Sequence, residues 1–95
     1  MADNQLKRSI ITVLGKDAVG IIAKVCTYLA SNHINILDIN QTITAGYLNM
    51  MMVVESEEII KTFSDMSNEL SQIGEEIGCR IQVQHEDIFE MMHRI

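Results

Sequence analysis

The feature that most constrains this chain is its hydrophobic periodicity, which alternates between strand-like and helix-like spacing within 95 residues. Short β-branched or alternating runs at 8–15, 34–44, 47–54 and 79–85 predict strands. Apolar residues at helical spacing over 18–32 and 59–77 predict helices between them. The order βαββαβ predicts an α+β, ferredoxin-like sandwich, in which both helices cover one face of an antiparallel four-stranded sheet.

Capping and turn residues predict the boundaries of these elements. Asp17 suits the N-cap of the first helix, and Asn32 is expected to close that helix in the left-handed conformation. The Ala-Gly pair at 45–46 predicts a tight hairpin turn. Ser56, which two glutamates follow, is expected to cap the second helix, and Gly78 is expected to end it. The strand over 47–54 is apolar on both faces, which is typical of a central strand.

The length of the chain fits a single domain over residues 1–95. We expect the folded core to span about residues 8–86. The remaining segment, 87–95, has apolar residues at helical spacing, which predicts a short C-terminal helix packed on the domain or on a partner. These apolar residues are Ile88, Met91, Met92 and Ile95.

The predicted sheet has one face without helices, and that face needs a cover. Apolar residues from Ile10 or Ile11 and from Met50 or Met51 are expected there. Exposed apolar patches usually mark contact sites, and a domain of this size often gains further burial by association. The sequence therefore predicts a homodimer.

Composition excludes several classes of partner. The formal net charge is −6, and no basic cluster is denser than Lys7 and Arg8, so a nucleic-acid partner is not expected. No apolar run approaches the ~20 residues that span a bilayer, and the first residues lack a signal-peptide core. We expect a cytoplasmic protein without a membrane partner. Cys26 and Cys79 are isolated, so no metal and no other cofactor is expected.

The sequence also lacks a catalytic constellation. His33, His85 and His93 lie far apart at element ends or in the tail, where solvated or capping roles are the usual ones. Other proteins of the same strand order need basic aromatic strands for RNA, paired thiols for copper, or an arginine loop for phosphoryl groups, and none is present. We expect no catalytic residues.

The loop between the first strand and the first helix, residues 15–20, is the most informative segment. A glycine-bounded turn into a helix exposes backbone N–H groups at the positive end of the helix dipole, where a carboxylate binds well. Asp17 would pair with an ammonium group, so the loop matches both charges of a free amino acid. The alternative is that Asp17 only caps the helix and Gly20 only allows helix and sheet to approach closely.

Three segments carry a family resemblance. Residues 10–22 form a strand followed by Asp-x-x-Gly, and residues 34–42 contain a strand that begins Asn-Ile. Residues 87–95 contain Ile-Phe-x-x-Met-x-x-Ile. Together these segments resemble the ACT domains, and the last resembles the short stand-alone ACT proteins of bacteria and archaea.

The resemblance implies a function. ACT domains typically bind amino acids between paired subunits, through the loop after the first strand, the start of the first helix and the facing second strand. By resemblance the ligand-binding residues are Asp17, Val19, Gly20, Asn35 and Asp38. The leading hypothesis is a non-catalytic regulatory domain that binds an amino acid or similar small metabolite at a homodimer interface and acts on a regulated protein partner. A structural protein–protein interaction module without a ligand is the alternative, and a small enzyme ranks third.

Overall fold

The elements of the chain follow the predicted order. The computed structural model describes residues 6–57 and 60–86. The elements are β1 (Leu6–Gly15), α1 (Ala18–Ser31), β2 (Asn35–Thr44), β3 (Tyr47–Glu57), α2 (Phe63–Ile77) and β4 (Arg80–His85). The predicted α+β, ferredoxin-like fold is confirmed over these residues. The predicted C-terminal helix over 87–95 lies outside them.

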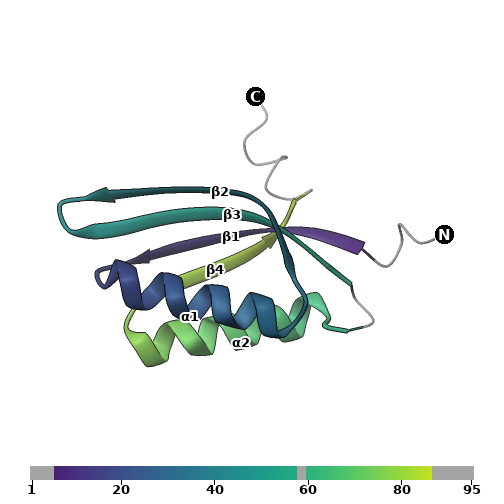
Figure 1. The fold of residues 1–95 in the computed structure, drawn as a ribbon. Helices are drawn as coiled ribbons and strands as arrows, with labels where there is room; N and C mark the ends of the chain where they lie inside the picture. Colours follow the sequence, from purple (N-terminus) through teal and green to yellow (C-terminus); the bar gives the residue numbers. More distant parts are fainter. Residues whose placement is uncertain (1–5, 58–59, 87–95) are drawn as a thin grey trace.

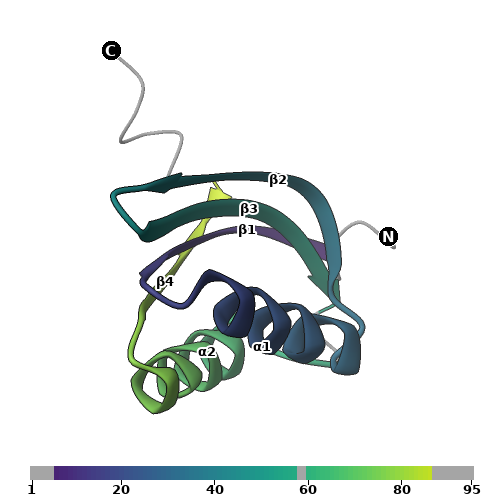
Figure 2. The same ribbon diagram turned by 60° about the vertical axis from the view of Figure 1, so that its left-hand side comes forward.

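The strands form one antiparallel sheet in the order β2-β3-β1-β4. In the register of β1 with β3, Gly15 lies opposite Leu48 and Leu6 lies opposite Glu57. Both helices lie side by side against the same face of this sheet, as Figures 1 and 2 show. We call the other face of the sheet the open face. The prediction that β3 is central is confirmed, because β3 pairs with β1 and β2.

Period-two alternation along β3 places the core between the sheet and the helices. The apolar residues at even positions of β3 are at most 2% exposed and belong to the core between the sheet and the helices: Leu48, Met50, Met52 and Val54. Ile11 and Val13 of β1 join them, and so do Met66 and Leu70 of α2. The odd positions of β3 therefore face the opposite way. Of the residues that the sequence left undecided, Ile10 and Met51 lie on the open face, whereas Ile11 and Met50 belong to the core.

The second helix begins later than the sequence predicts. Ser56 does not cap it, because β1 extends to Leu6 and pairs with β3 as far as Glu57. Ser56 is only 4% exposed within that strand. Thr62 takes the role of N-cap, and its Oγ1 accepts a hydrogen bond from the backbone N of Asp65 at 3.1 Å. Backbone pairing across the sheet thus overrides a local capping signal.

The end of α1 also differs from the prediction. Asn32 has φ −106°, and the left-handed residue is His33 with φ 57°. The side-chain Nδ2 of Asn32 donates a hydrogen bond to the carbonyl oxygen of Tyr28 at 2.9 Å. The backbone N of Ile34 donates to the carbonyl oxygen of Leu29 at 2.9 Å, which directs Ile34 into the core. The predicted turn at 45–46 is confirmed, since Ala45 and Gly46 both have positive φ.

Gly15 marks the closest approach between β1 and the connection from α2 to β4. A Cβ atom at Gly15 would lie 2.6 Å from the Cβ of Cys79 and 2.6 Å from the Cδ1 of Ile21. The Ile21 methyl group can move, but the Cys79 Cβ is fixed to the backbone. We expect Gly15→Ala to lower the free energy of unfolding by about 1–3 kcal/mol.

Urea denaturation measures this effect, and a double-mutant cycle assigns it to the contact. Cys79→Gly removes the opposing Cβ atom and should cost less stability in the Gly15→Ala background than in the wild type. Additive costs would show that the overlap with Cys79 is not the cause.

Candidate functional site

The loop at residues 15–20, which joins β1 to α1, carries three of the predicted site residues. Asp17 is the N-cap of α1, and its Oδ1 accepts a hydrogen bond from the backbone N of Gly20 at 3.2 Å. The backbone N of Ile21 donates to the carbonyl oxygen of Asp17 at 2.9 Å. Val19 is 82% exposed. The loop is therefore a capped helix N-terminus with one carboxylate and an exposed apolar side chain.

Gly20 leaves room for the Asp17 carboxylate. A Cβ atom at Gly20 would lie 2.6 Å from the Oδ2 of Asp17, so a side chain there would push the carboxylate aside. The close helix-to-sheet approach that we considered for Gly20 occurs at Gly15 instead. Within Ala18–Ser31 the first helical turn contains no acidic residue. Asp17 thus supplies the negative charge beside the positive end of the helix dipole.

The other two predicted site residues lie on β2. Asn35 pairs with Glu55 at the beginning of the strand. Asp38 follows a bulge in the pairing at Leu37, and its Oδ1 accepts a hydrogen bond from the backbone N of Ile39 at 2.9 Å. Both side chains are exposed. They are accessible, but they stand at the opposite end of the sheet from the loop.

A single chain does not bring the two groups of predicted residues together. Gly15 lies opposite Leu48 of β3, whereas Asn35 lies opposite Glu55 of the same strand. Seven residues of extended strand separate those two levels, a distance of about 23 Å. A small amino acid cannot contact both groups in one copy of the chain.

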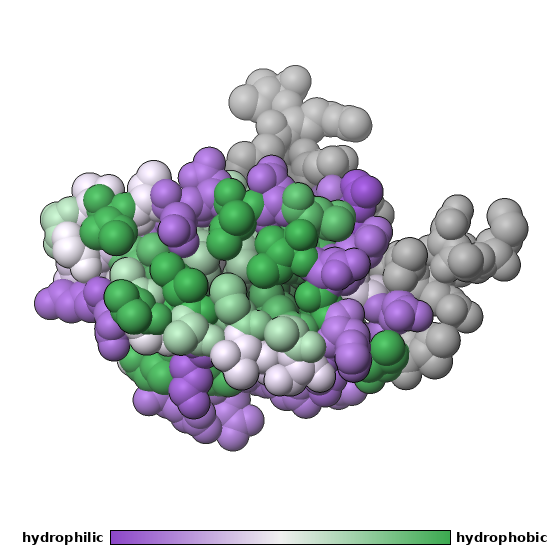
Figure 3. Space-filling model, in the orientation of Figure 1, coloured by the Kyte–Doolittle hydropathy of each residue, from purple (hydrophilic) through white to green (hydrophobic). Residues whose placement is uncertain are grey.

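The side of the molecule formed by β2 and α1 carries a broad apolar surface. Every residue of β2 is exposed, and β2 is an edge strand with a neighbour on one side only. Figure 3 shows hydrophobic residues spread over this side of the molecule. We call the exposed apolar residues of β2 and of the first turn of α1 the edge patch. They are Val19, Ile36, Leu37, Ile39 and Ile43.

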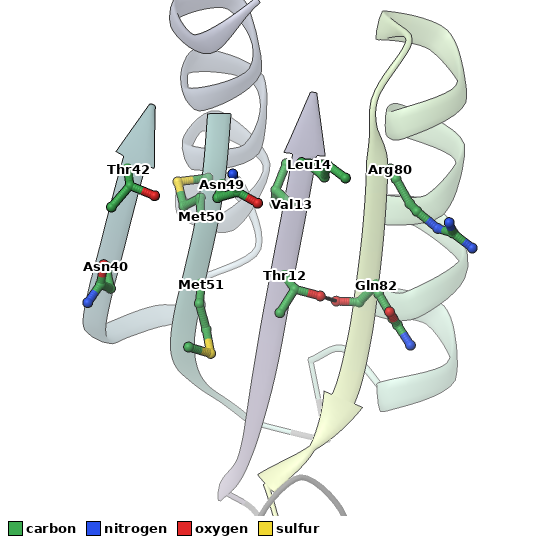
Figure 4. A pocket seen from close by; sticks show the side chains of 10 residues that line it. All are labelled: Thr12, Val13, Leu14, Asn40, Thr42, Asn49, Met50, Met51, Arg80 and Gln82. Atoms are coloured by element: carbon green, nitrogen blue, oxygen red, sulfur yellow. Dashed lines mark hydrogen bonds between the residues drawn. The ribbon is translucent and has the colours of Figure 1, made fainter. Parts of the chain in front are cut away.

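The open face contains a depression that the sequence analysis missed. Two rows that cross the sheet line most of it. One row is Gln82, Thr12, Met51 and Asn40, and the next is Arg80, Leu14, Asn49 and Thr42. The volume of the depression is about 410 Å³, and Figure 4 shows the side chains that line it. The alternating polar residues of β2 and β4 could have indicated a polar sheet face. Only the strand order shows that the polar residues of both strands share one face.

Comparison with known proteins assigns the family. The sequence pattern described as an ACT domain matches residues 7–84. The chain belongs to the ACT domain family. UPF0237 proteins of Bifidobacterium longum and Methanocaldococcus jannaschii are 52% and 43% identical to it over 90 residues, which are 95% of this chain and 100% of each relative.

Solved structures agree with this assignment. The ACT domain protein from Streptococcus pneumoniae has a TM-score of 0.76 and 39% identity, over 88% of this chain and 94% of that chain. A formyltetrahydrofolate deformylase from Pseudomonas putida has a TM-score of 0.71 at 13% identity, over 81% of this chain and 28% of that chain. This second likeness shows the fold alone. ACT domains generally act as regulatory domains that dimerise and bind small ligands.

Family membership points to a non-catalytic regulatory domain. Within residues 6–57 and 60–86, no three histidine, cysteine or acidic side chains are grouped so that they would hold a metal ion. Burial raises the pKa of the Cys79 thiol, which keeps it protonated and a poor nucleophile. In the same part of the chain no helix has the length and apolar character needed to cross a membrane.

A polar cluster joins the two helices of this ACT domain. The Tyr28 hydroxyl of α1 donates a hydrogen bond to Oε1 of Glu69 in α2 at 2.7 Å. Nζ of Lys61 lies 3.0 Å from the same oxygen and 3.2 Å from Oε2. The hydrogen bonds from Tyr28 and Lys61 lower the pKa of Glu69, while burial is the main cause that raises the pKa of Tyr28. The cluster is structural, since Tyr28 joins α1 to α2 through Glu69 and Lys61 neutralises that carboxylate from the segment before α2.

This cluster predicts a pH dependence of stability. The pKa of Glu69 is lower in the folded chain than its ordinary value of 4.5, so its contribution to stability is present above that value. The contribution is lost as the pH falls through the folded pKa. We expect Glu69→Gln to unfold with a weaker dependence on pH than the wild type below about pH 4.5.

Urea denaturation across the acidic range measures this dependence. Tyr28→Phe removes the main hydrogen bond to the carboxylate and should weaken the dependence in the same direction. A Glu69→Gln chain with the wild-type slope would contradict the assignment.

Proposed function

We propose that this chain is a non-catalytic regulatory domain that binds an amino acid or similar zwitterion between two copies of itself. The observation that carries the proposal is the geometry at the start of α1. Asp17 holds its carboxylate beside the helix N-terminus, and Gly20 leaves space for that carboxylate. A ligand ammonium group pairs with Asp17, and a ligand carboxylate accepts a hydrogen bond from the backbone N–H of Val19, because the N–H groups of Gly20 and Ile21 already donate to Asp17. Membership of the ACT family supports this role.

A second copy completes the site. The residues expected to meet the ligand from β2, Asn35 and Asp38, lie about 23 Å and about 17 Å along the sheet from the loop of their own chain. An antiparallel pairing of two β2 edges around a two-fold axis at Ile39 sets position 35 of one copy close to position 43 of the other. The partner subunit's Asn35 and Asp38 then approach the loop of the first copy.

The edge patch supports the same arrangement. An exposed edge strand with apolar side chains is a ready template for pairing with another strand. The five residues of the edge patch lie on β2 and on the first turn of α1, next to the proposed ligand position. Strand pairing and burial of apolar side chains would therefore stabilise the same dimer interface. A ligand bound at that interface would favour the dimer over the separate chains. Its regulatory effect would be a change in how the dimer meets a protein partner.

The proposal predicts which substitution separates the subunits. We expect the wild type to scatter light as a dimer of twice 10.7 kDa. Ile39→Lys places a charge in the paired edge and should give a monomer at micromolar concentration. Ile60→Lys is the matched control, because Ile60 is 49% exposed and Ile39 is 45% exposed, but Ile60 lies outside β2. A dimer that survives Ile39→Lys would place the interface elsewhere.

The ligand test uses two variants that are each defective alone. Thermal-shift screening of the twenty amino acids identifies a ligand, and calorimetry then measures its affinity. Asp17→Asn preserves the helix cap, since Asn caps about as well as Asp, but removes the charge. We expect Asp17→Asn and Asp38→Asn to weaken binding by about tenfold or more each.

Mixing the two variants distinguishes a shared site from a site within one chain. A mixed dimer has one site with both carboxylates and one site with neither. We therefore expect wild-type affinity at one of the two sites of each mixed dimer, and mixed dimers make up about half of the dimers after random exchange of equal amounts. Mixtures that stay as weak as the separate variants would contradict a site shared between subunits. A dimer that no amino acid stabilises would favour the alternative function, an interaction module without a ligand.

A further inference from the structure

Polar side chains in the depression on the open face are free to contact a bound molecule. The carboxamides of Asn40, Asn49 and Gln82 have no hydrogen-bond partner among the residues that the structure describes. Arg80 likewise forms no ion pair with a described carboxylate. Figure 4 shows these side chains on β2, β3 and β4. Polar groups that converge on one depression are typical of a small-molecule site.

The depression carries a single charge among its described lining residues, the guanidinium of Arg80. A guanidinium binds a carboxylate through two parallel hydrogen bonds, and it stays protonated in proteins. Figure 4 shows this guanidinium at the outer margin of the depression, beside β4. One cation without a neighbouring acid therefore favours a ligand with one carboxylate, held at this margin.

Two exposed apolar side chains near Arg80 offer a surface for a flat ring. Leu14 lies directly opposite Arg80 in the register of β1 with β4 and is 46% exposed. Met51 lies on β3 in the neighbouring row and is 39% exposed. Aromatic rings pack well on apolar side chains, and the sulfur of methionine adds a favourable contact. An aromatic ring is therefore the part of a ligand that suits the centre of the depression.

The spacing of the strands limits the size of that ligand. Arg80, Leu14 and Asn49 stand in one row across β4, β1 and β3, which covers two strand spacings, about 10 Å. A six-membered ring with one carboxylate fits between the guanidinium and the Asn49 carboxamide. Ring nitrogen and oxygen atoms would meet that carboxamide, which both donates and accepts hydrogen bonds. The volume of about 410 Å³ also lies within the usual range of small-ligand sites, about 300–1,000 Å³.

We propose that the depression binds a heteroaromatic carboxylate. Its carboxylate pairs with Arg80, and its ring lies on Leu14 and Met51. Its heteroatoms hydrogen-bond to Asn49 and Gln82. A second copy of the chain fits the depression less well, because the centres of protein interfaces are depleted of charged residues. The proposal does not rest on the amino-acid site, because these five residues lie on β1, β3 and β4 and not in the loop before α1.

An NMR titration with two matched pairs of probes tests the site. Orotate and nicotinate are six-membered heteroaromatic carboxylates, and uracil and nicotinamide are their counterparts without a carboxylate. We expect at least one of the carboxylates to shift the backbone amides of Thr12, Asn49 and Gln82 with Kd below about 1 mM. Its neutral counterpart should bind at least about tenfold more weakly, because it lacks the charge that pairs with Arg80. The proposal is wrong if neither carboxylate shifts these amides at about 10 mM.

A pair of charge variants assigns the carboxylate contact. Arg80→Gln should weaken binding of the carboxylate probe by about tenfold or more and leave its neutral counterpart unchanged. Lys24→Gln is the matched control, because Lys24 is an exposed cation of α1, on the other side of the sheet. It should keep the wild-type affinity. Equal effects of the two substitutions, or a neutral probe that weakens as much as its carboxylate, would contradict pairing with Arg80.

Amide shifts without any probe test the competing occupant, a second copy of the chain. We expect the amides of Thr12, Asn49 and Gln82 to keep their shifts when the protein is diluted about tenfold. Changes confined to the edge of β2 would come from the proposed dimer contact and would support an open depression. Changes at Thr12, Asn49 and Gln82 on dilution would show that another copy covers the open face, and would overturn the proposal.

Discussion

The antiparallel register of β1 with β3 is the constraint on which the rest of this structure depends. It aligns Gly15 with Leu48 and Arg8 with Glu55, and thereby decides which residues of both strands face the helices. A shift of β1 by one residue against β3 would move Ile11 from the core to the open face. The same register places the loop before α1 at one end of the sheet and the exit of β4 at the other.

A single four-stranded sheet with helices on one side leaves two of its surfaces without a packing or pairing partner. One is the edge of β2, where every side chain is exposed and backbone groups on one side lack a neighbouring strand. The other is the open face, where Leu14 and Met51 are 46% and 39% exposed among polar side chains. We assign a second copy of the chain to the edge. The separation between Asp17 and Asn35 makes this assignment necessary for a shared ligand site.

Local patterns in the sequence were sufficient to predict the order of the elements and the central position of β3 in the sheet. They were insufficient where a distant strand overrides a local signal. Ser56 has the side chain of a helix cap, but pairing with Lys7 keeps it in β3. Similarly, the left-handed conformation occurs at His33 and not at Asn32, where the sequence predicts it. The side chain of Asn32 instead donates a hydrogen bond to the carbonyl oxygen of Tyr28 in the last turn of α1.

The candidate site shows the same limit of sequence reasoning. Asp17 was predicted as a helix cap from neighbouring residues, and the structure confirms that local role. Residue types alone carry no information on distance, so they could not show that Asn35 and Asp38 lie far from the loop of their own chain. The depression on the open face was missed for the same reason, since its residues come from all four strands and become neighbours only through the sheet order.

The location of a bound ligand tests the central claim most directly. Backbone amide chemical shifts, recorded by NMR as the amino acid from the screen is added to saturation, map the residues that it contacts. The account predicts that the largest changes fall in two separate stretches, 17–20 and 35–38, in the same titration. Changes confined to Thr12, Asn49 and Gln82 of the open face, with residues 17–20 unaffected, would contradict it.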